Sequence, residues 1–128
     1  MLNVESSFKE TAKSNKNAIG LMQIKLSTAN YLNDLNNQNK ITETQLFTPA
    51  TNIKYGCAYL KYLIDKFENL NTALASYNAG ETRVREWLKS GIYSVDGKTL
   101  SYIPYEETRN YVEKINKNFK YYTKIFNI

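Results

Sequence analysis

Apolar residues recur at intervals of three and four positions along most of this 128-residue chain. This spacing places them on one side of an α-helix, whereas a half-buried strand would alternate apolar and polar residues. No sustained alternation flanked by hairpin turns is present, so we expect few strands or none. The length suits one domain and is too short for two ordinary ones. The sequence therefore predicts a mostly α, compact domain of about five to seven helices with little or no β-structure.

The clearest predicted helix begins at Thr48-Pro49, because threonine can cap a helix and proline suits its first position. Cys57, the only cysteine, falls within this helix and is interpreted as a small buried residue. Its apolar stripe, which predicts a helix facing the core, consists of Ile53, Cys57, Leu60, Leu63, Ile64 and Phe67.

Three further helices are expected in the second half of the chain. One covers 71–79, with Asn71 as its cap and Gly80 as its stop signal, and its apolar content on most sides predicts a central helix. The second covers 81–89. A loop over 91–103 follows, and Pro104 then opens a long helix. The residues expected on one side of that helix are Tyr111, Val112, Ile115, Phe119 and Tyr122.

The first part of the chain has shorter predicted elements. Residues 2–9 and 18–32 have helical character, the latter around Gly20, and they are separated by a polar turn over 13–17. An asparagine-rich loop is expected over 33–40.

The chain contains no histidine and a single cysteine, which removes several kinds of chemistry. A Ser–His or Cys–His nucleophile pair, an imidazole base and the usual His/Cys zinc site all need residues that are absent. An intrachain disulfide is excluded as well. We therefore expect no metal and no cofactor, and catalysis must rely on carboxylates, hydroxyls, lysines or the backbone.

Lysine and arginine outnumber the acidic residues by 17 to 12, which gives a formal net charge of +5. This balance favours anionic partners without choosing among nucleic acid, acidic lipid and an anionic cell-wall polymer. The basic residues are spread along the chain, with no arginine-rich arm and no nucleic-acid motif, so we expect no nucleic-acid partner. The apolar runs are too short to span a membrane, and Met1–Val4 shows no signal peptide.

Five short motifs follow one another in a fixed order. They are Glu5-Ser6-Ser7-Phe8, Gly20-Leu21-Met22-Gln23-Ile24, Phe47 to Ile53 running into Gly56-x-x-Tyr59-Leu60, Ala75-Ser76-Tyr77-Asn78-Ala79-Gly80, and Glu107-Thr108-Arg109-x-Tyr111-Val112. Together they resemble the catalytic domain of the soluble lytic transglycosylases, from Val4 to about Tyr111. One four-letter string is common by chance, but five in the right order and spacing are not. Position 76 is serine where many relatives carry alanine.

The resemblance implies a lysozyme-like helical fold, related to goose-type lysozyme, with an active-site cleft. It also implies a peptidoglycan lytic transglycosylase that cleaves the bond between N-acetylmuramic acid and N-acetylglucosamine without water and leaves a 1,6-anhydromuramyl product. In this family a single glutamate acts as acid and then as base, and Glu5 stands at its place. This role requires Glu5 to be protonated near neutral pH, which burial beside apolar groups favours. Without its motif, Glu5 would be interpreted as a solvated surface carboxylate.

The resemblance further implies a set of substrate-binding residues, which are Ser14, Met22, Gln23, Tyr77, Glu107 and Tyr111. Each motif also has a structural interpretation. Gly20 to Gln23 could be a close-packed helix crossing, and Asn78 to Gly80 suits a helix end. Glu107 and Arg109 could form an ordinary exposed pair.

We expect one catalytic domain over residues 1–128, shortened at its N-terminus because only four residues precede Glu5. Its expected partner is the glycan strand of peptidoglycan, its expected state is a monomer, and its expected location is periplasmic or extracellular, at the cell wall. Three alternatives remain open: a hydrolase on the same fold, such as a goose-type lysozyme or a chitinase-like enzyme; a non-catalytic glycan-binding module; and, ranked last, a nucleic-acid-binding protein.

Overall fold

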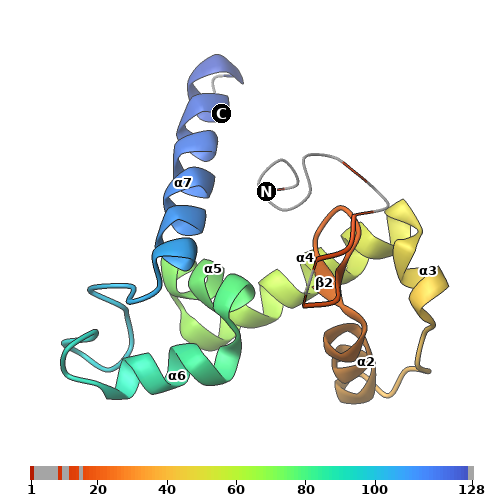
Figure 1. The fold of residues 1–128 in the computed structure, drawn as a ribbon, viewed down its shortest axis with the longest axis horizontal. Helices are drawn as coiled ribbons and strands as arrows, with labels where there is room; N and C mark the ends of the chain where they lie inside the picture. Colours follow the sequence, from red (N-terminus) through yellow and green to blue (C-terminus); the bar gives the residue numbers. More distant parts are fainter. Residues whose placement is uncertain (2–8, 10–11, 15, 127–128) are drawn as a thin grey trace. The chain divides into compact units, whose positions relative to one another are not determined.

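The computed structural model describes residues 1, 9, 12–14 and 16–126, with the backbone alone over 121–126. The chain divides into two compact units, Met1–Lys61 and Tyr62–Ile128, and each is treated separately below. In the described part there are six helices, α2 to α7, and one two-stranded sheet (Figure 1). The predicted mostly α fold with few strands is confirmed.

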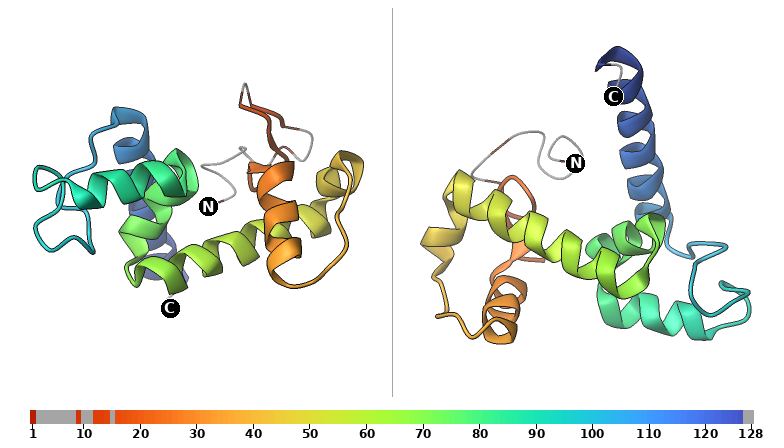
Figure 2. Two further views of the ribbon diagram at one scale, coloured as in Figure 1. Left: turned by 90° about the horizontal axis from the view of Figure 1, so that it is seen from below. Right: turned by 180° about the vertical axis from the view of Figure 1, so that it is seen from behind.

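The first unit is built from a small hairpin and the helices that follow it. Strand β1 (Ala18–Ile19) pairs antiparallel with β2 (Ile24–Lys25), with Ile19 opposite Ile24. Figure 2 shows the hairpin running directly into α2 (Leu26–Leu35). Helices α3 (Glu43–Phe47) and α4 (Pro49–Phe67) complete the unit, although α4 extends past its boundary. Its core consists of Ile19, Ile24, Ala29, Leu46 and Tyr55.

The helix predicted over 18–32 is wrong for its first eight positions, which form the hairpin instead. Gly20 has φ 74° and Gln23 has φ 47°, and an α-helix cannot continue through these left-handed conformations. Ile19 and Ile24 therefore reach the core from paired strands rather than from one helix face. Strands of two residues are too short to produce an alternation that the sequence could reveal.

The loop predicted over 33–40 begins later than expected, because α2 continues to Leu35. Helix α3 was not predicted, and its start is a capping box. The Thr42 hydroxyl accepts a hydrogen bond from the Gln45 amide at 3.2 Å, and the Gln45 side-chain oxygen accepts one from the Thr42 amide at 2.8 Å. This reciprocal pair satisfies two backbone donors at a helix that is only five residues long.

Helix α4 begins at Pro49 as predicted, but its buried face is turned by one position from the predicted stripe. Asn52, Tyr55, Gly56 and Leu63 are buried, whereas Cys57 is exposed. The interpretation of Cys57 as a buried residue is therefore wrong. The inward face includes an asparagine, a tyrosine and a glycine, which a count of apolar residues leaves out.

The second unit is a set of three helices in which α5 (Leu70–Ala79) contacts both α6 (Glu81–Lys89) and α7 (Glu106–Phe126). Every residue of α5 from Thr72 to Tyr77 is buried, which confirms the predicted central helix. Its cap is Asn69 rather than Asn71, because the Asn69 side-chain oxygen accepts a hydrogen bond from the Thr72 amide at 2.9 Å.

Helix α6 has the predicted bounds, with Val84 and Trp87 buried. Helix α7 begins at Glu106, two positions after the predicted Pro104, and the Tyr105 carbonyl accepts the Arg109 amide at 2.9 Å. Tyr111 and Val112 are buried as expected, whereas Phe119 is 66% exposed and was wrongly assigned to the inward side. The predicted position of Tyr122 concerns a side chain outside the described residues.

The predicted loop between α6 and α7 is confirmed, and it is ordered by Asp96. The Asp96 carboxylate accepts hydrogen bonds from the Thr99 and Lys98 amides, each at 2.9 Å. These two bonds lower the pKa of Asp96 to about 2. Over the part of the chain that the structure describes, no helix combines the length and apolar character needed to cross a bilayer.

Candidate functional site

The predicted acid/base, Glu5, and the rest of its Glu-Ser-Ser-Phe motif lie outside the described residues. The role of Glu5 therefore stays a prediction. The other six predicted site residues are described, with Ser14, Met22 and Gln23 in the first unit and Tyr77, Glu107 and Tyr111 in the second.

The Gly20–Gln23 motif forms the turn of the hairpin, and Asn52 of α4 holds it in place. The Asn52 side-chain oxygen accepts a hydrogen bond from the Met22 amide at 2.8 Å. Its side-chain nitrogen donates to the Ile19 carbonyl at 2.9 Å and to the Leu46 carbonyl at 3.0 Å. Because this amide is fully buried and both of its ends are satisfied, it joins the hairpin to α3 and α4. Sequence reasoning placed Asn52 in a motif but gave it no role.

Two glycines allow the hairpin to lie this close to α4. A side chain on Gly20 would overlap the Asn52 amide, and its φ of 74° is a conformation that other residues rarely adopt. A side chain on Gly56 would overlap the Met22 side chain. The interpretation of the Gly20–Gln23 motif as a close-packed crossing was therefore correct. The element that packs against α4 is a hairpin turn, however, and not a helix.

The three predicted residues of the first unit are all tied to this hairpin. Met22 is 4% exposed and packs on Gly56. The Gln23 side-chain nitrogen donates to the Gly20 carbonyl at 2.8 Å and to the Ala12 carbonyl at 3.2 Å. The Ser14 hydroxyl is exposed and accepts a hydrogen bond from the Ala18 amide at 3.0 Å. The hairpin and the residues just before it therefore form one small hydrogen-bonded structure, and both Ser14 and Gln23 belong to it.

In the second unit, a side-chain hydrogen bond joins two of the motifs. The Thr108 hydroxyl of α7 donates to the Asn78 side-chain oxygen of α5 at 2.8 Å. Tyr77, beside Asn78, is 9% exposed, and Tyr111, one turn after Thr108, is 6% exposed. Glu107, beside Thr108, is exposed. The α5–α7 contact thus positions all three predicted residues of this unit, and it supports the structural role expected for Asn78.

Arg109 does not form the pair with Glu107 that was considered from the sequence. Its Nη2 donates to the Tyr102 hydroxyl at 2.7 Å, and its Nε donates to the Ile103 carbonyl at 3.1 Å. The guanidinium also lies over the Tyr102 ring, 4.8 Å from the ring centre. Through these contacts Arg109 holds the loop before α7 against that helix. The guanidinium of Arg109 is therefore not engaged with the Glu107 carboxylate.

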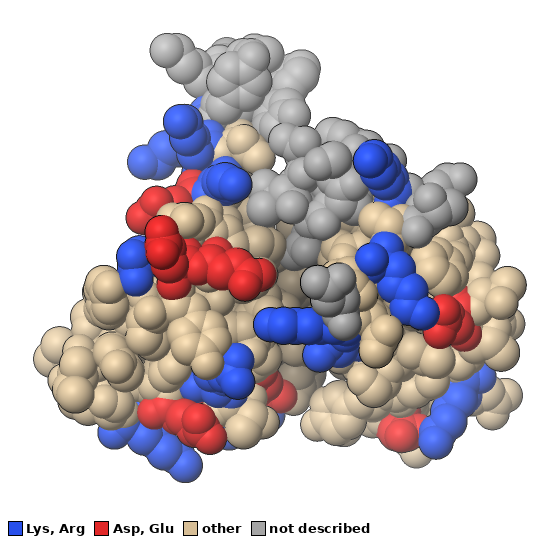
Figure 3. Space-filling view, viewed as in Figure 1, with Lys and Arg blue, Asp and Glu red and all other residues tan. Residues whose placement is uncertain are grey.

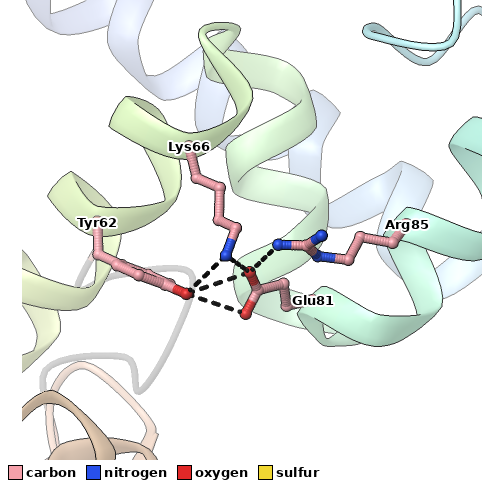
Figure 4. A network of polar contacts seen from close by, with 4 residues as sticks. All are labelled: Tyr62, Lys66, Glu81 and Arg85. Atoms are coloured by element: carbon pink, nitrogen blue, oxygen red, sulfur yellow. Dashed lines mark hydrogen bonds and ion pairs between the residues drawn. The ribbon is translucent and has the colours of Figure 1, made fainter. Parts of the chain in front are cut away.

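A polar network centred on Glu81, directly after the Ala75–Gly80 motif in the chain, was not predicted from the sequence (Figure 4). Glu81 forms ion pairs with Lys66 at 2.9 Å and with Arg85 at 3.0 Å, and it accepts hydrogen bonds from the Tyr62 hydroxyl at 3.2 and 3.3 Å. Partial burial alone would raise the pKa of the Glu81 carboxyl, but the hydrogen bonds from Lys66 and Arg85 outweigh it and lower that pKa. The bond to Glu81 in turn raises the pKa of Lys66. Such a carboxylate is held ionised and is not suited to donate a proton.

In the face drawn in Figure 3, basic and acidic side chains are interspersed and not gathered into one patch. Within the described ranges, no group of three or more His, Cys, Asp or Glu side chains could hold a metal ion.

The chain is similar to several lytic transglycosylases. It is 40% identical over 114 residues to a putative soluble lytic murein transglycosylase of Haemophilus influenzae, which covers 87% of this chain and 19% of that protein. It is also similar to two solved structures, each with a TM-score of 0.81, 32% identity, and coverage of 98% of this chain and 21% of the other. They are an inactive mutant of the lytic transglycosylase Slt from Pseudomonas aeruginosa and the 70 kDa soluble lytic transglycosylase Slt70 from Escherichia coli.

The helical architecture and its neighbours thus define the lysozyme-like fold of the lytic transglycosylases. The transglycosylase SLT domain family matches residues 1–107, and the chain belongs to that family. The chain spans about a fifth of the length of the curated relatives it matches.

Proposed function

We propose that this chain is the catalytic domain of a peptidoglycan lytic transglycosylase. The observation that carries the proposal is membership of the SLT domain family over residues 1–107, together with the lytic transglycosylases to which the chain is similar. The proposed substrate is the β-1,4 bond between N-acetylmuramic acid and N-acetylglucosamine. The proposed location is the periplasm or the cell exterior, where that substrate is found.

The proposed mechanism uses Glu5 twice. The protonated carboxyl first gives its proton to the glycosidic oxygen, so that the N-acetylglucosamine side leaves as an alcohol. The muramyl 2-acetamido group stabilises the cation that develops at C1. The ionised Glu5 then removes the proton of the muramyl 6-hydroxyl, whose oxygen closes onto C1 to form the 1,6-anhydro ring. No water enters the product, so no second carboxylate is needed to activate one.

Two observations support a single carboxylate in this role. The Pseudomonas aeruginosa relative was solved as an inactive mutant in which one glutamate is replaced by glutamine, and this chain keeps a glutamate in its Glu-Ser-Ser-Phe motif. The other carboxylates weighed from the sequence are exposed in the structure, as expected for solvated charges. They are Asp34, Glu43, Asp65 and Glu68.

We further propose that the binding residues have different roles. The polar groups of Ser14, Gln23 and Tyr77 position the acetamido and hydroxyl groups of the sugars, and Glu107 contacts the glycan or its peptide. Met22 and Tyr111 are nearly fully buried, so each would shape the surface against which a sugar ring lies.

Replacing Glu5 with glutamine tests the mechanism, because glutamine keeps the size of the side chain and removes the proton. We expect anhydromuropeptide release from purified sacculi to fall by about 10²- to 10⁴-fold, as measured by mass spectrometry. The fold should be retained by circular dichroism. Asp34→Asn, at an exposed carboxylate, is the matched control and should keep full activity. Retained activity in Glu5→Gln would refute the assignment of Glu5. Products one water heavier than the anhydro form would instead indicate the hydrolase alternative.

A further inference from the structure

The later part of α7 extends beyond the helix on which its first part packs. The bonds of Thr108 to Asn78 and of Asn116 to Asn71 show that α5 and α7 run antiparallel, with the start of α5 at the level of Asn116. The residues of α7 after Asn116 therefore continue past α5, as Figure 1 shows. The SLT domain match ends at residue 107, so this part of α7 lies outside it. None of the proposed catalytic and glycan-binding residues belongs to it.

This part of α7 is basic. Lys114, Lys117 and Lys120 recur at intervals of three residues, which places them on one side of the helix, and all three are exposed. Among the residues that the structure describes, none of the three forms an ion pair. Glu113 is the last acidic residue of the chain, and a fourth lysine follows at position 124. The positive charge of this segment, residues 114–120, is therefore not neutralised by acidic side chains within it.

Exposed apolar side chains accompany these lysines. Phe119 is 66% exposed and lies seven positions after the buried Val112, so it continues the side of α7 that packs on α5. Leu70 is 48% exposed and directly precedes Asn71, whose side chain bonds to Asn116, so it lies at the same end of the α5–α7 pair. A helix with lysines on one side and an aromatic residue on the other is the arrangement that binds at a membrane surface.

We propose that residues 114–120 of α7, together with Leu70, bind the surface of a bilayer that contains anionic phospholipid. The three lysines would lie near the lipid phosphates, and Phe119 and Leu70 would reach the boundary of the acyl chains. The charge of the lysines is complementary to an anionic surface. The exposed apolar side chains favour a bilayer over a dissolved anionic polymer, because only the bilayer offers an apolar phase. This binding does not depend on the proposed catalytic function.

The test measures cosedimentation of the full chain with two kinds of vesicle, one of phosphatidylcholine alone and one of phosphatidylcholine and phosphatidylglycerol in equal parts. We expect the chain to bind the anionic vesicles at least about tenfold more tightly. A triple variant that removes the three lysines should lose at least about tenfold of this affinity. It carries Lys114→Gln, Lys117→Gln and Lys120→Gln.

A second triple variant is the matched control, because it removes the same charge from exposed lysines elsewhere. It carries Lys25→Gln, Lys40→Gln and Lys98→Gln. We expect it to change the affinity for anionic vesicles by no more than about twofold, since distant charges are screened. Equal affinity for the two kinds of vesicle, or equal losses in the two triple variants, would overturn the proposal.

A single substitution tests the apolar contribution. Phe119→Ser should weaken binding to the anionic vesicles about fivefold, because it removes the apolar area that would leave water. Val95→Ser is the control, since Val95 is 92% exposed in the loop before α7, and it should leave the affinity unchanged. Binding to heparin, a soluble polyanion, should be the same in Phe119→Ser as in the parent chain. Full vesicle binding by Phe119→Ser would overturn the proposal and would indicate a site for a dissolved anionic polymer instead.

Discussion

At the scale of single residues, the side chain of Asn52 carries three backbone hydrogen bonds while it is fully buried. The groups it satisfies belong to Met22, Ile19 and Leu46, which lie in three different segments. The amide therefore satisfies backbone groups from three segments at one buried point that water does not reach.

Replacing Asn52 with alanine should therefore be strongly destabilising. Three backbone groups in the core would lose their hydrogen bond to Asn52, and we expect the free energy of unfolding to fall by about 2–4 kcal/mol in urea denaturation. Cys57→Ala, in the same helix but at an exposed position, is the matched control and should change it by less than about 0.5 kcal/mol. Similar losses in both variants would contradict the role given to Asn52.

Ser76 is a residue at which the opposite effect is expected. Its hydroxyl is fully buried in α5 and has no hydrogen-bond partner among the residues described. Ser76→Ala removes an unsatisfied polar atom and leaves the packing intact, so we expect a gain of about 1 kcal/mol in thermal or urea unfolding. A clear loss of stability would show that this hydroxyl has a partner.

At the scale of elements, the Glu81 network connects the last two turns of α4 with the start of α6 (Figure 4). Tyr62 and Lys66 project from α4, and Arg85 lies one turn along α6 from Glu81. The corner between α5 and α6, which ends the Ala75–Gly80 motif, is thereby fixed to a third helix. The contribution of this network to the free energy of unfolding is modest, because Lys66 and Arg85 are partly exposed.

The network should make stability depend on pH at the acidic side. The pKa of Glu81 is lower in the folded chain than in the unfolded chain. Its contribution is therefore present above the unfolded value near 4.5 and is lost as the pH falls through the lower folded value. Glu81→Gln should cost about 0.5–1 kcal/mol at neutral pH and a smaller amount in acid, as measured by thermal unfolding across pH. The exposed change Glu86→Gln is the control, and an equal pH dependence in the two variants would contradict the prediction.

At the scale of the whole molecule, the chain carries a formal charge of +5 without a concentrated patch on the face drawn. Such a charge raises the local concentration of an anionic polymer without specifying a binding geometry. The residues proposed to contact the glycan are distributed over both units.

This charge should make binding to sacculi sensitive to salt. Raising sodium chloride from about 50 to about 500 mM should lower the fraction that cosediments with purified sacculi by about two- to fivefold, because screening shortens the reach of the basic side chains. Binding of a neutral chitooligosaccharide should change little under the same conditions. Salt-independent cosedimentation would show that the net charge plays no part.

The elements that could be predicted are those whose signals are local. Pro49 opens α4, Gly80 separates α5 from α6, and the 91–103 segment forms a loop, all as the residues at those positions indicated. The caps were less predictable. Asn69 and Asn71 are both of a residue type that caps helices. Asn69 is the cap because α5 begins at Leu70 in the folded chain. Likewise, the exposure of Cys57 depended on which side of α4 met the hairpin.

The helical class, the start of α4, the end of α5, both ends of α6 and the resemblance to the lytic transglycosylases could all be predicted from the sequence. The reason is that helix caps, helix breakers and ordered motifs are properties of neighbouring residues. The tertiary structure decided the rest. The attachment of the 18–25 hairpin to α4, the buried face of α4, and the pairing of Thr108 with Asn78 all depend on residues about 30 positions apart. Such contacts form only when the chain has folded, since their energy comes from burying polar groups against specific partners that no local pattern reveals.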